Sequence, residues 1–361
     1  MLRHALHEFE AVIKLTAVSP LLVKDGRIPT EAAEREKLVS DKRDREQMPV
    51  ALPISRNSRD DIVKALINRV DPLAAAGQLD FYIPGSSMKG AWRSHLERVL
   101  RGLTTEEDAR VCDPLDDDGV EVDKMQVGRC SACSEVLIQK KKLYTEGKKK
   151  FVFPAYAMSC PICRMFGNTT IASRVKISDG ERKVKGRLIQ REHVAINRKN
   201  GQVMRGPFKY FALQDSEFEV TVTLRNYELQ HLVLLAVLFS DLGGMRVPLG
   251  SGKSKGYGQV QAVLQGLKFT AFGLECPDGP LSGLAEHPLC GTQLADEYRW
   301  TSAEKRPQLT GFVQDEIAPW RWQRKLKVQE FFELVKGIPL RWDKVAKLEQ
   351  RMAWEPGRAP A

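Results

Sequence analysis

Two pairs of cysteines have the spacing of a metal site. Cys130 and Cys133 form one C-x-x-C pair, Cys160 and Cys163 form another, and 26 residues separate the pairs. Tetrahedral zinc needs four ligands, and each pair supplies two thiolates about 2.3 Å from the metal. The spacing therefore predicts a structural zinc site. Two alternatives stay open: reduced surface cysteines or a redox pair in place of zinc, and Cys112 in place of one ligand.

A second motif, GSGKSKGYG at residues 250–258, contains the Gly-Lys-Ser core of phosphate-binding loops. A Walker A loop has the pattern G-x-x-x-x-G-K-[ST] and opens a helix. Here Val247 stands where the first glycine is required, and the alternating residues 258–264 predict a strand after the loop. These differences disfavour a nucleotide hydrolase. They favour a flexible basic turn between a helix and a strand.

The composition is compatible with a polyanionic partner. The 361 residues include 56 Lys and Arg against 46 Asp and Glu, a formal net charge of +10. Lys and Arg gain affinity for nucleic acids by releasing phosphate counterions, although a basic soluble protein would have the same balance. No run of about 18 apolar residues predicts a membrane span. The charged N-terminal residues lack an apolar signal segment, so we expect a cytoplasmic protein, in which seven cysteines argue against disulfides.

Hydrophobic patterning predicts the elements that carry these motifs. Helical periodicity predicts a helix that Ser86 or Ser87 caps and an apolar helix at 229–242. A hairpin is predicted around residues 198–201. Alternation predicts strands at residues 9–18, 171–178, 218–224 and 258–264. The order β-α-β-β-α-β is that of a ferredoxin-like unit, in which the glycine-rich loop joins the second helix to the last strand.

The chain divides into two parts by composition. Residues 1–267 are predicted to form one domain with insertions at about 24–60 and about 110–165, the second of which carries the cysteine pairs. Beyond residue 268 the composition changes, and five of the six tryptophans follow position 299. Residues 268–361 are predicted to be a C-terminal helical extension that docks on the domain or on a neighbouring subunit. An ordinary amphipathic core helix is the alternative.

Four stretches in this order resemble the RAMP superfamily of CRISPR systems: IPGSSMKGAWRSHLE, CPICRMFGN, HVAINRKNGQVMRGPFKYF and GGMRVPLGSGKSKGYGQV. More narrowly, they are similar to backbone subunits of type III effector complexes, of a III-D-like kind. The resemblance covers roughly residues 8–267. It implies an α+β fold, a ferredoxin-like or RRM-like palm with a thumb hairpin. It also implies that copies or related subunits stack along a guide CRISPR RNA, which pairs with a complementary target RNA.

Residue chemistry agrees with RNA binding. Hydroxyls and backbone N–H groups at a helix start, cationic side chains and close-approaching glycines all suit a phosphate backbone. Such contacts position a strand without reading its sequence, as expected where base pairing carries specificity. The predicted RNA-binding residues are Ser86, Ser87, Lys89, Arg93, Arg198, Lys199, Gly250, Gly252, Lys253, Lys255, Gly256 and Tyr257.

The resemblance also suggests that the chain cleaves the target RNA. Related backbone subunits often cut with an aspartate that precedes the IPGSS motif, and Asp71 occupies the matching position. Such a carboxylate would hold Mg²⁺ or Mn²⁺ or align the 2′-hydroxyl for attack. Asp25 and Asp80 are rival positions, and Lys14 or Lys24 would stabilise the developing charge. The alternatives are a non-catalytic scaffold whose nuclease is another subunit and, third, a guide-processing ribonuclease.

Overall fold

The computed structural model describes residues 4–24, 52–58, 61, 79–103, 111–113, 133–134, 137–138, 155–288, 290 and 306–338. Three of the predicted site residues, Asp71, Asp25 and Cys130, lie outside the described residues. So does much of both predicted insertions. Among the helices described, none is long and apolar enough to cross a membrane.

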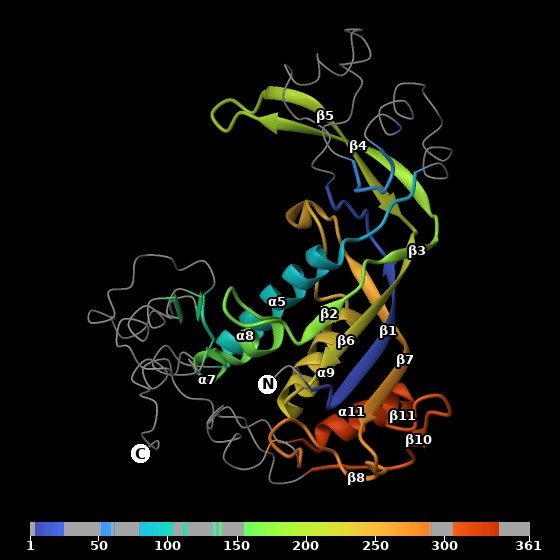
Figure 1. Cartoon of the computed structure of the whole chain (residues 1–361). Coiled ribbons are helices and arrows are strands. Elements are labelled where there is room, and N and C mark those ends of the chain that lie inside the picture. The colour runs from blue at the N-terminus through green and yellow to red at the C-terminus, as the bar shows by residue number, and fades with distance from the viewer. Residues whose placement is uncertain are drawn as a thin grey trace, which may run out of the picture.

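Within the described part of the chain, a seven-stranded antiparallel sheet forms the centre (Figure 1). Its strands run in the order β10-β11-β7-β1-β6-β2, and β3 also pairs with β6. Their bounds are β1 (His7–Ala17), β2 (Val175–Ile177), β3 (Glu181–Val184), β6 (Glu217–Arg225), β7 (Val260–Phe272), β10 (Val313–Gln314) and β11 (Arg321–Leu326). A further short pair consists of β8 (Gly279–Pro280) and β9 (Gln308–Leu309). The predicted α+β class is confirmed in this coarse sense.

Alternation along β1 decides which face of the sheet is buried. Every second residue from His7 to Ala17 is buried, and those between are half-buried. Phe9 lies opposite Leu224 of β6, and Ile13 lies opposite Val220, so the apolar residues of neighbouring strands share one face. Burying one such side chain contributes about 1.5–3 kcal/mol. The alternation that predicted this strand therefore also builds the core.

Helices α5 (Gly85–Gly102) and α9 (Leu229–Gly243) cover the buried face (Figure 1). Both predicted helices are confirmed, but the predicted serine cap of α5 is wrong. Pro84 is the N-cap residue and no side chain of the cap accepts a hydrogen bond. Instead, the Gly85 N–H donates to Asp179 Oδ1 at 2.8 Å, so a carboxylate from outside the helix satisfies this unpaired donor.

The predicted hairpin is present and is longer than expected. Strands β4 (Arg187–Ile196) and β5 (Val203–Gln214) form a separate two-stranded antiparallel ribbon. The pairing extends from Arg187 opposite Gln214 to Ile196 opposite Val203. Figure 1 shows the ribbon projecting away from the central sheet.

The C-terminal segment is part of the sheet and its core. Strand β11 pairs with β7 along six positions, from Arg321 opposite Phe272 to Leu326 opposite Leu267. Helix α11 (Val328–Lys336) follows, and the fully buried Phe331 stacks on Phe9 with ring centroids 5.0 Å apart. The helical expectation is therefore wrong for residues 321–326, because the otherwise unpaired edge of β7 offers backbone hydrogen bonds that a strand can take up.

Candidate metal centre and nucleic-acid interface

Four buried cysteines form a cluster that is positioned to bind a metal ion. The sulfur atoms of Cys112, Cys133, Cys160 and Cys163 all lie within 4.8 Å of one another. The Cys112 sulfur is 3.6 Å from both the Cys160 sulfur and the Cys163 sulfur. Ligands at 2.3 Å from a tetrahedral zinc ion would be about 3.8 Å apart. The cluster therefore has nearly the size that a four-thiolate zinc site requires.

The second C-x-x-C pair is shaped by a short helix, α8 (Pro161–Phe166). Cys160 is its N-cap residue, and its sulfur accepts a hydrogen bond from the Cys163 N–H at 3.4 Å. The Cys133 sulfur accepts one from the Cys160 N–H at 3.3 Å. Gly167 ends the helix at φ +81°, where a Cβ atom would lie 2.7 Å from the Ser173 nitrogen. This turn directs both thiols of the pair to the same place.

Electrostatics in the cluster call for a cation. Hydrogen bonds with Cys133 and the other thiols, together with burial, raise the pKa of Cys112. Four thiols this close cannot all ionise unless a positive charge offsets them. A divalent, thiophilic metal such as zinc supplies that charge, and thiolate ligands select such metals over Mg²⁺ or Ca²⁺. The donor set thus fits the predicted zinc, with Cys112 as a member.

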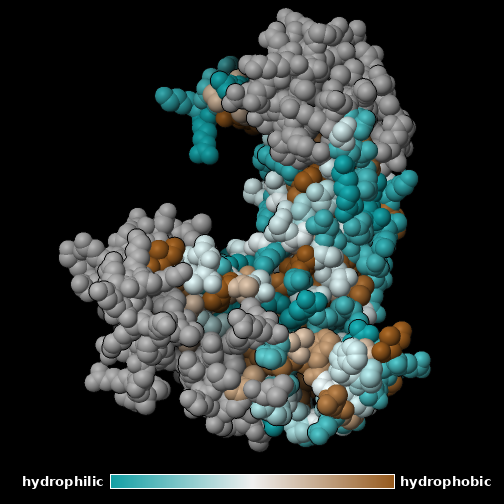
Figure 2. All heavy atoms as spheres, in the orientation of Figure 1, coloured by the Kyte–Doolittle hydropathy of each residue, from teal (hydrophilic) through white to brown (hydrophobic). Residues whose placement is uncertain are grey.

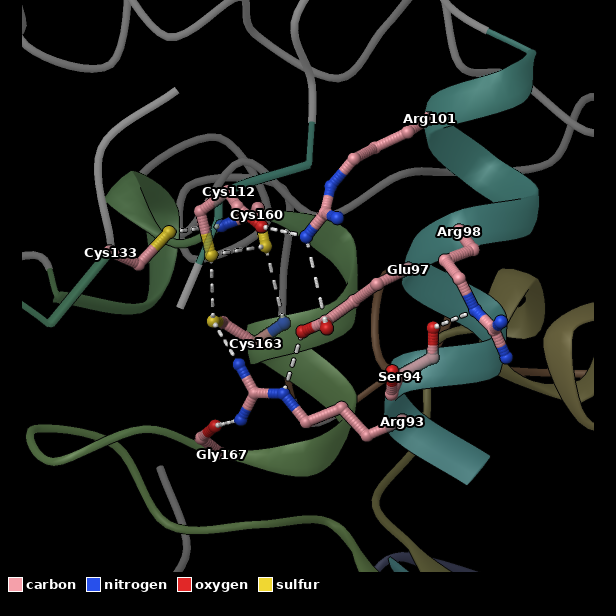
Figure 3. A network of polar contacts seen from close by, with 10 residues as sticks. All are labelled: Arg93, Ser94, Glu97, Arg98, Arg101, Cys112, Cys133, Cys160, Cys163 and Gly167. Carbon is pink, nitrogen blue, oxygen red and sulfur yellow. Dashed lines mark hydrogen bonds and ion pairs between the residues drawn. The ribbon is translucent and has the colours of Figure 1, made fainter. Parts of the chain in front are cut away.

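One face of α5 contacts the cluster (Figure 3). The Arg93 guanidinium donates to the Cys163 sulfur at 3.2 Å, to the Gly167 carbonyl at 2.9 Å and to Glu97 Oε1 at 2.8 Å. Arg101 Nη2 donates to the Cys112 carbonyl at 3.0 Å. Burial opposes the charge of Arg93, but Cys163 and Glu97 outweigh this effect and raise its pKa. Burial also disfavours the charged form of Glu97, and this raises the pKa of its carboxyl group.

Arg93 was predicted from the sequence to contact RNA, which stays a prediction, and the structure places its guanidinium at the thiol cluster. The other predicted residues of this helix lie nearer its start. Ser86 and Ser87 are exposed in the first turn. Lys89 is half-buried, and burial followed by the charge of Arg93 lowers its pKa. The sequence signal that could have identified this helix face is the spacing of four residues from Arg93 to Glu97 and from Glu97 to Arg101.

A second site forms where the glycine-rich loop meets the base of the hairpin. The Ser251 N–H donates to the Leu22 carbonyl at 2.7 Å, and the Leu21 N–H donates to the Leu213 carbonyl of β5 at 2.7 Å. Tyr257 is a buried residue, and its hydroxyl lies 2.9 Å from His193 Nε2 of β4. The loop, residues 20–24 and the hairpin are thus held together. We call this region the loop–hairpin junction.

Glycines set the path of the loop. Gly250 and Gly258 have φ of +76° and +83°, and a Cβ atom would lie 2.4 Å from the Leu22 carbonyl oxygen and 2.0 Å from that of Leu249. A Cβ atom on Gly252 would press against the Tyr257 ring at 3.1 Å. Gly256, at φ +80°, has nothing within 4 Å. Close packing anchors the ends of the loop and leaves its middle, the 3₁₀ turn Lys253–Lys255, exposed.

Cationic side chains surround the junction. Lys24 Nζ is 5.8 Å from the centre of the Tyr210 ring. Burial, with the charges of Lys255 and Arg191, lowers the pKa of His193. Arg191 was not among the predicted residues, because an isolated arginine in a strand carries no motif. The arrangement offers phosphate-binding charges beside aromatic rings, the combination with which proteins bind single-stranded nucleic acids.

The hairpin carries cationic and exposed apolar side chains to its tip. Arg198 and Lys199 are exposed at the turn. Figure 2 shows this end as a hydrophilic projection with hydrophobic residues behind it. Four apolar side chains of the hairpin are 46–62% exposed: Val194, Ile196, Val203 and Met204.

Two of the side chains considered for catalysis have ion-pair partners. Lys14 Nζ is 3.1 Å from Glu217 Oε1. The Asp80 carboxylate is 3.4 Å from the Arg56 guanidinium.

Comparison with known proteins gives a family match. A model of the RAMP superfamily matches residues 14–261, which is more than half of the chain. The matched region begins in β1 and ends in β7, and it includes α5, the four cysteines, the hairpin and the glycine-rich loop. No curated protein matches the chain.

Proposed function

Because the chain belongs to the RAMP superfamily, whose members bind CRISPR RNA and work in multi-subunit complexes, we propose that it is a guide-binding backbone subunit of a type III-like effector complex. It would act in cytoplasmic antiviral defence, beside neighbouring copies or related subunits. The observation that carries the proposal is the loop–hairpin junction. There, Lys24, Arg191 and Lys255 gather around aromatic side chains within the matched region.

The fold supports the same proposal. The strand order β7-β1-β6-β2, with α5 after β1 and α9 after β6, is the order of a ferredoxin-like β-α-β-β-α-β unit. We assign this unit as the palm and the β4–β5 hairpin as the thumb. In this assignment the guide backbone crosses the glycine-rich loop, where Gly256 leaves space for a phosphate and Lys253 and Lys255 supply charge.

The test is the salt dependence of guide RNA binding. Removing both lysines with Lys253→Ala/Lys255→Ala should weaken binding and reduce the slope of log K against log salt by about 1.4, since each single-strand phosphate contact contributes about 0.7. Lys325→Ala/Lys336→Ala removes the same charge from the C-terminal segment and is the matched control. If both double variants change the slope equally, general charge and not the loop attracts RNA.

We propose that zinc occupies the four-cysteine site and stabilises the surrounding segments. Metal analysis of the purified chain should find about one zinc per chain, as a Cys₄ site requires. Cys160→Ser should lose it, while Cys276→Ser, which alters an exposed cysteine outside the cluster, should retain it. Wild-type protein without zinc, or equal zinc in both variants, would contradict this assignment.

We further propose that this subunit itself cleaves the target RNA, with Asp71 as the acid and Mg²⁺ or Mn²⁺ as the metal. The assembled complex should cut labelled, guide-complementary RNA at regular intervals, and Asp71→Ala should abolish the cuts while guide binding stays intact. Cuts that survive the substitution would favour the scaffold alternative, with the nuclease elsewhere. Cleavage of a repeat-containing precursor instead of the paired target would favour a guide-processing ribonuclease.

A further inference from the structure

We propose that Arg93 is a positioning residue of the metal site, and that it couples metal binding at the four cysteines to RNA binding at the start of helix α5. The second half of this inference rests on the proposed function. The first half, that Arg93 supports the metal site, does not. Nothing in the spacing of the cysteines points to this residue, because 70 positions separate it from Cys163.

Arg93 connects two parts of the site at once. Each of its three guanidinium nitrogens has a partner: Nη2 the Cys163 sulfur, Nη1 the Gly167 carbonyl and Nε the Glu97 carboxylate. Cys163 lies in α8 and Gly167 ends that helix, so one side chain fixes both a ligand and the turn that orients it. The guanidinium is a rigid fork, and this three-way contact uses its geometry.

The same face of α5 holds the other cysteine-bearing segment. Arg101 lies eight residues after Arg93, and its Nη2 donates to the Cys112 carbonyl at 3.0 Å. Glu97, between them and 4% exposed, lies 2.8 Å from Arg93 Nε and 3.9 Å from Arg101 Nη2. Figure 3 shows these three side chains directed from α5 toward the thiols. Segments far apart in the chain are therefore held against one helix face.

The negative charge of a metal site with four thiolates explains why a cationic side chain lies at position 93. Four thiolates and one Zn²⁺ carry a net charge of about −2. A buried site with that charge needs compensation, and hydrogen bonds to its sulfurs and its backbone supply it. Side chains that support metal ligands in this way typically change metal affinity about 10- to 100-fold when removed.

The coupling follows from the position of Arg93 in α5. Lys89 precedes it by one helical turn, and Ser86 and Ser87 are exposed in the first turn. If the metal site fixes α5 through Arg93, it also fixes these groups. By linkage, metal then strengthens RNA binding and RNA strengthens metal binding by the same factor.

The first experiment measures metal affinity without RNA, with the full chain and a competing chelator. Arg93→Gln should weaken zinc binding by about 10- to 100-fold. Arg93→Lys should restore only part of this loss, because an ammonium group cannot make the three-way contact. Arg98→Gln is the matched control, since Arg98 Nε donates to the Ser94 carbonyl of its own helix, and zinc affinity should be unchanged.

A second variant guards against misfolding, because Arg93→Gln leaves Glu97 buried without its closest partner. Arg93→Gln/Glu97→Gln removes both charges and should weaken zinc binding to a similar extent. Cobalt(II) bound in place of zinc gives a sulfur-to-metal charge-transfer band that should shift in both variants, as a purely structural role would not require. Wild-type zinc affinity together with an unshifted band in the double variant would overturn the positioning role.

The second experiment measures binding of a labelled single-stranded guide RNA with the site loaded and with zinc chelated, at a temperature where circular dichroism shows both forms folded. Wild type should bind RNA several-fold more tightly when loaded, and the double variant should lose most of this difference. Equal RNA affinity of both wild-type forms would overturn the coupling while leaving the proposed function intact. Failure of wild type to bind guide RNA at all would overturn the proposed function, and the metal experiment would still stand.

Discussion

Replacing Phe331 with alanine tests whether the C-terminal segment belongs to the core of the matched domain. The Phe331 side chain is fully buried. Its ring stacks on Phe9 of β1 and lies 6.3 Å from the ring of Phe239 in α9. Residues from the start, middle and end of the chain therefore meet at this one side chain.

The expected loss is large. Truncating a buried phenylalanine to alanine typically costs about 3–5 kcal/mol, from lost transfer free energy and the cavity left behind. Domains are commonly stable by only about 5–15 kcal/mol, so this variant should lose a substantial part of its free energy of unfolding. Trp320→Ala is the control, because Trp320 is 55% exposed and its loss should change stability by about 0.5 kcal/mol or less.

Urea unfolding of the full chain, followed by circular dichroism with zinc present, measures both variants. A midpoint for Phe331→Ala close to that of Trp320→Ala would refute the reasoning. The C-terminal segment would then behave as an extension that docks on the domain, as predicted for residues 268–361. A large loss would mean that β11 and α11 unfold together with the matched domain and belong to its core.

Two further predictions concern the loop and the pH dependence of stability. Gly258→Ala should reduce both thermal stability and guide RNA affinity, because its Cβ atom would lie 2.0 Å from the Leu249 carbonyl oxygen. The Cβ atom of Gly256→Ala would meet open space, so this control variant should cost only about 1–2 kcal/mol of stability for its left-handed backbone. Equal effects of the two variants would contradict the packing argument. Burial lowers the pKa of His7 to about 3, so below about pH 6.5 the unfolded chain takes up the proton first and stability should fall by up to about 1.4 kcal/mol per pH unit. His7→Phe should flatten this dependence in urea titrations between pH 7 and 5, and parallel profiles for variant and wild type would exclude His7 as its source.

The elements that the sequence predicted correctly are those with a strong local pattern. Residues 9–18 alternate, and β1 occupies His7–Ala17. Within the predicted helix 229–242, residues 232–239 are continuously apolar, and α9 is buried on most of its surface. In both, the residues that pack the core also determine the local structure. Alternation at residues 258–264 likewise predicted a strand after the glycine-rich loop, and β7 begins at Val260.

Strand β11 lacked such a pattern. Its sequence RWQRKL has no clean alternation, and most of its residues are half-buried. What makes it a strand is the edge of β7, which is more than 40 residues earlier in the chain and invisible to local periodicity. The metal ligands show the same division. Cys160 and Cys163 are adjacent through α8, whereas Cys112 joins them only through tertiary structure.

Arg93 shows where residue chemistry alone cannot decide. A cation near a helix start suits a phosphate, and the thiolates of a metal site are also anionic, so the side chain fits either partner. Burial separates the two cases. Glu97, one turn later on the same face, is 4% exposed, and Arg93 itself is half-buried with its guanidinium 3.2 Å from the Cys163 sulfur. Nearly two turns before Arg93, Ser86 and Ser87 are exposed. If RNA binds at the start of α5 as proposed, its site and the metal site meet near Lys89, which is half-buried one turn before Arg93.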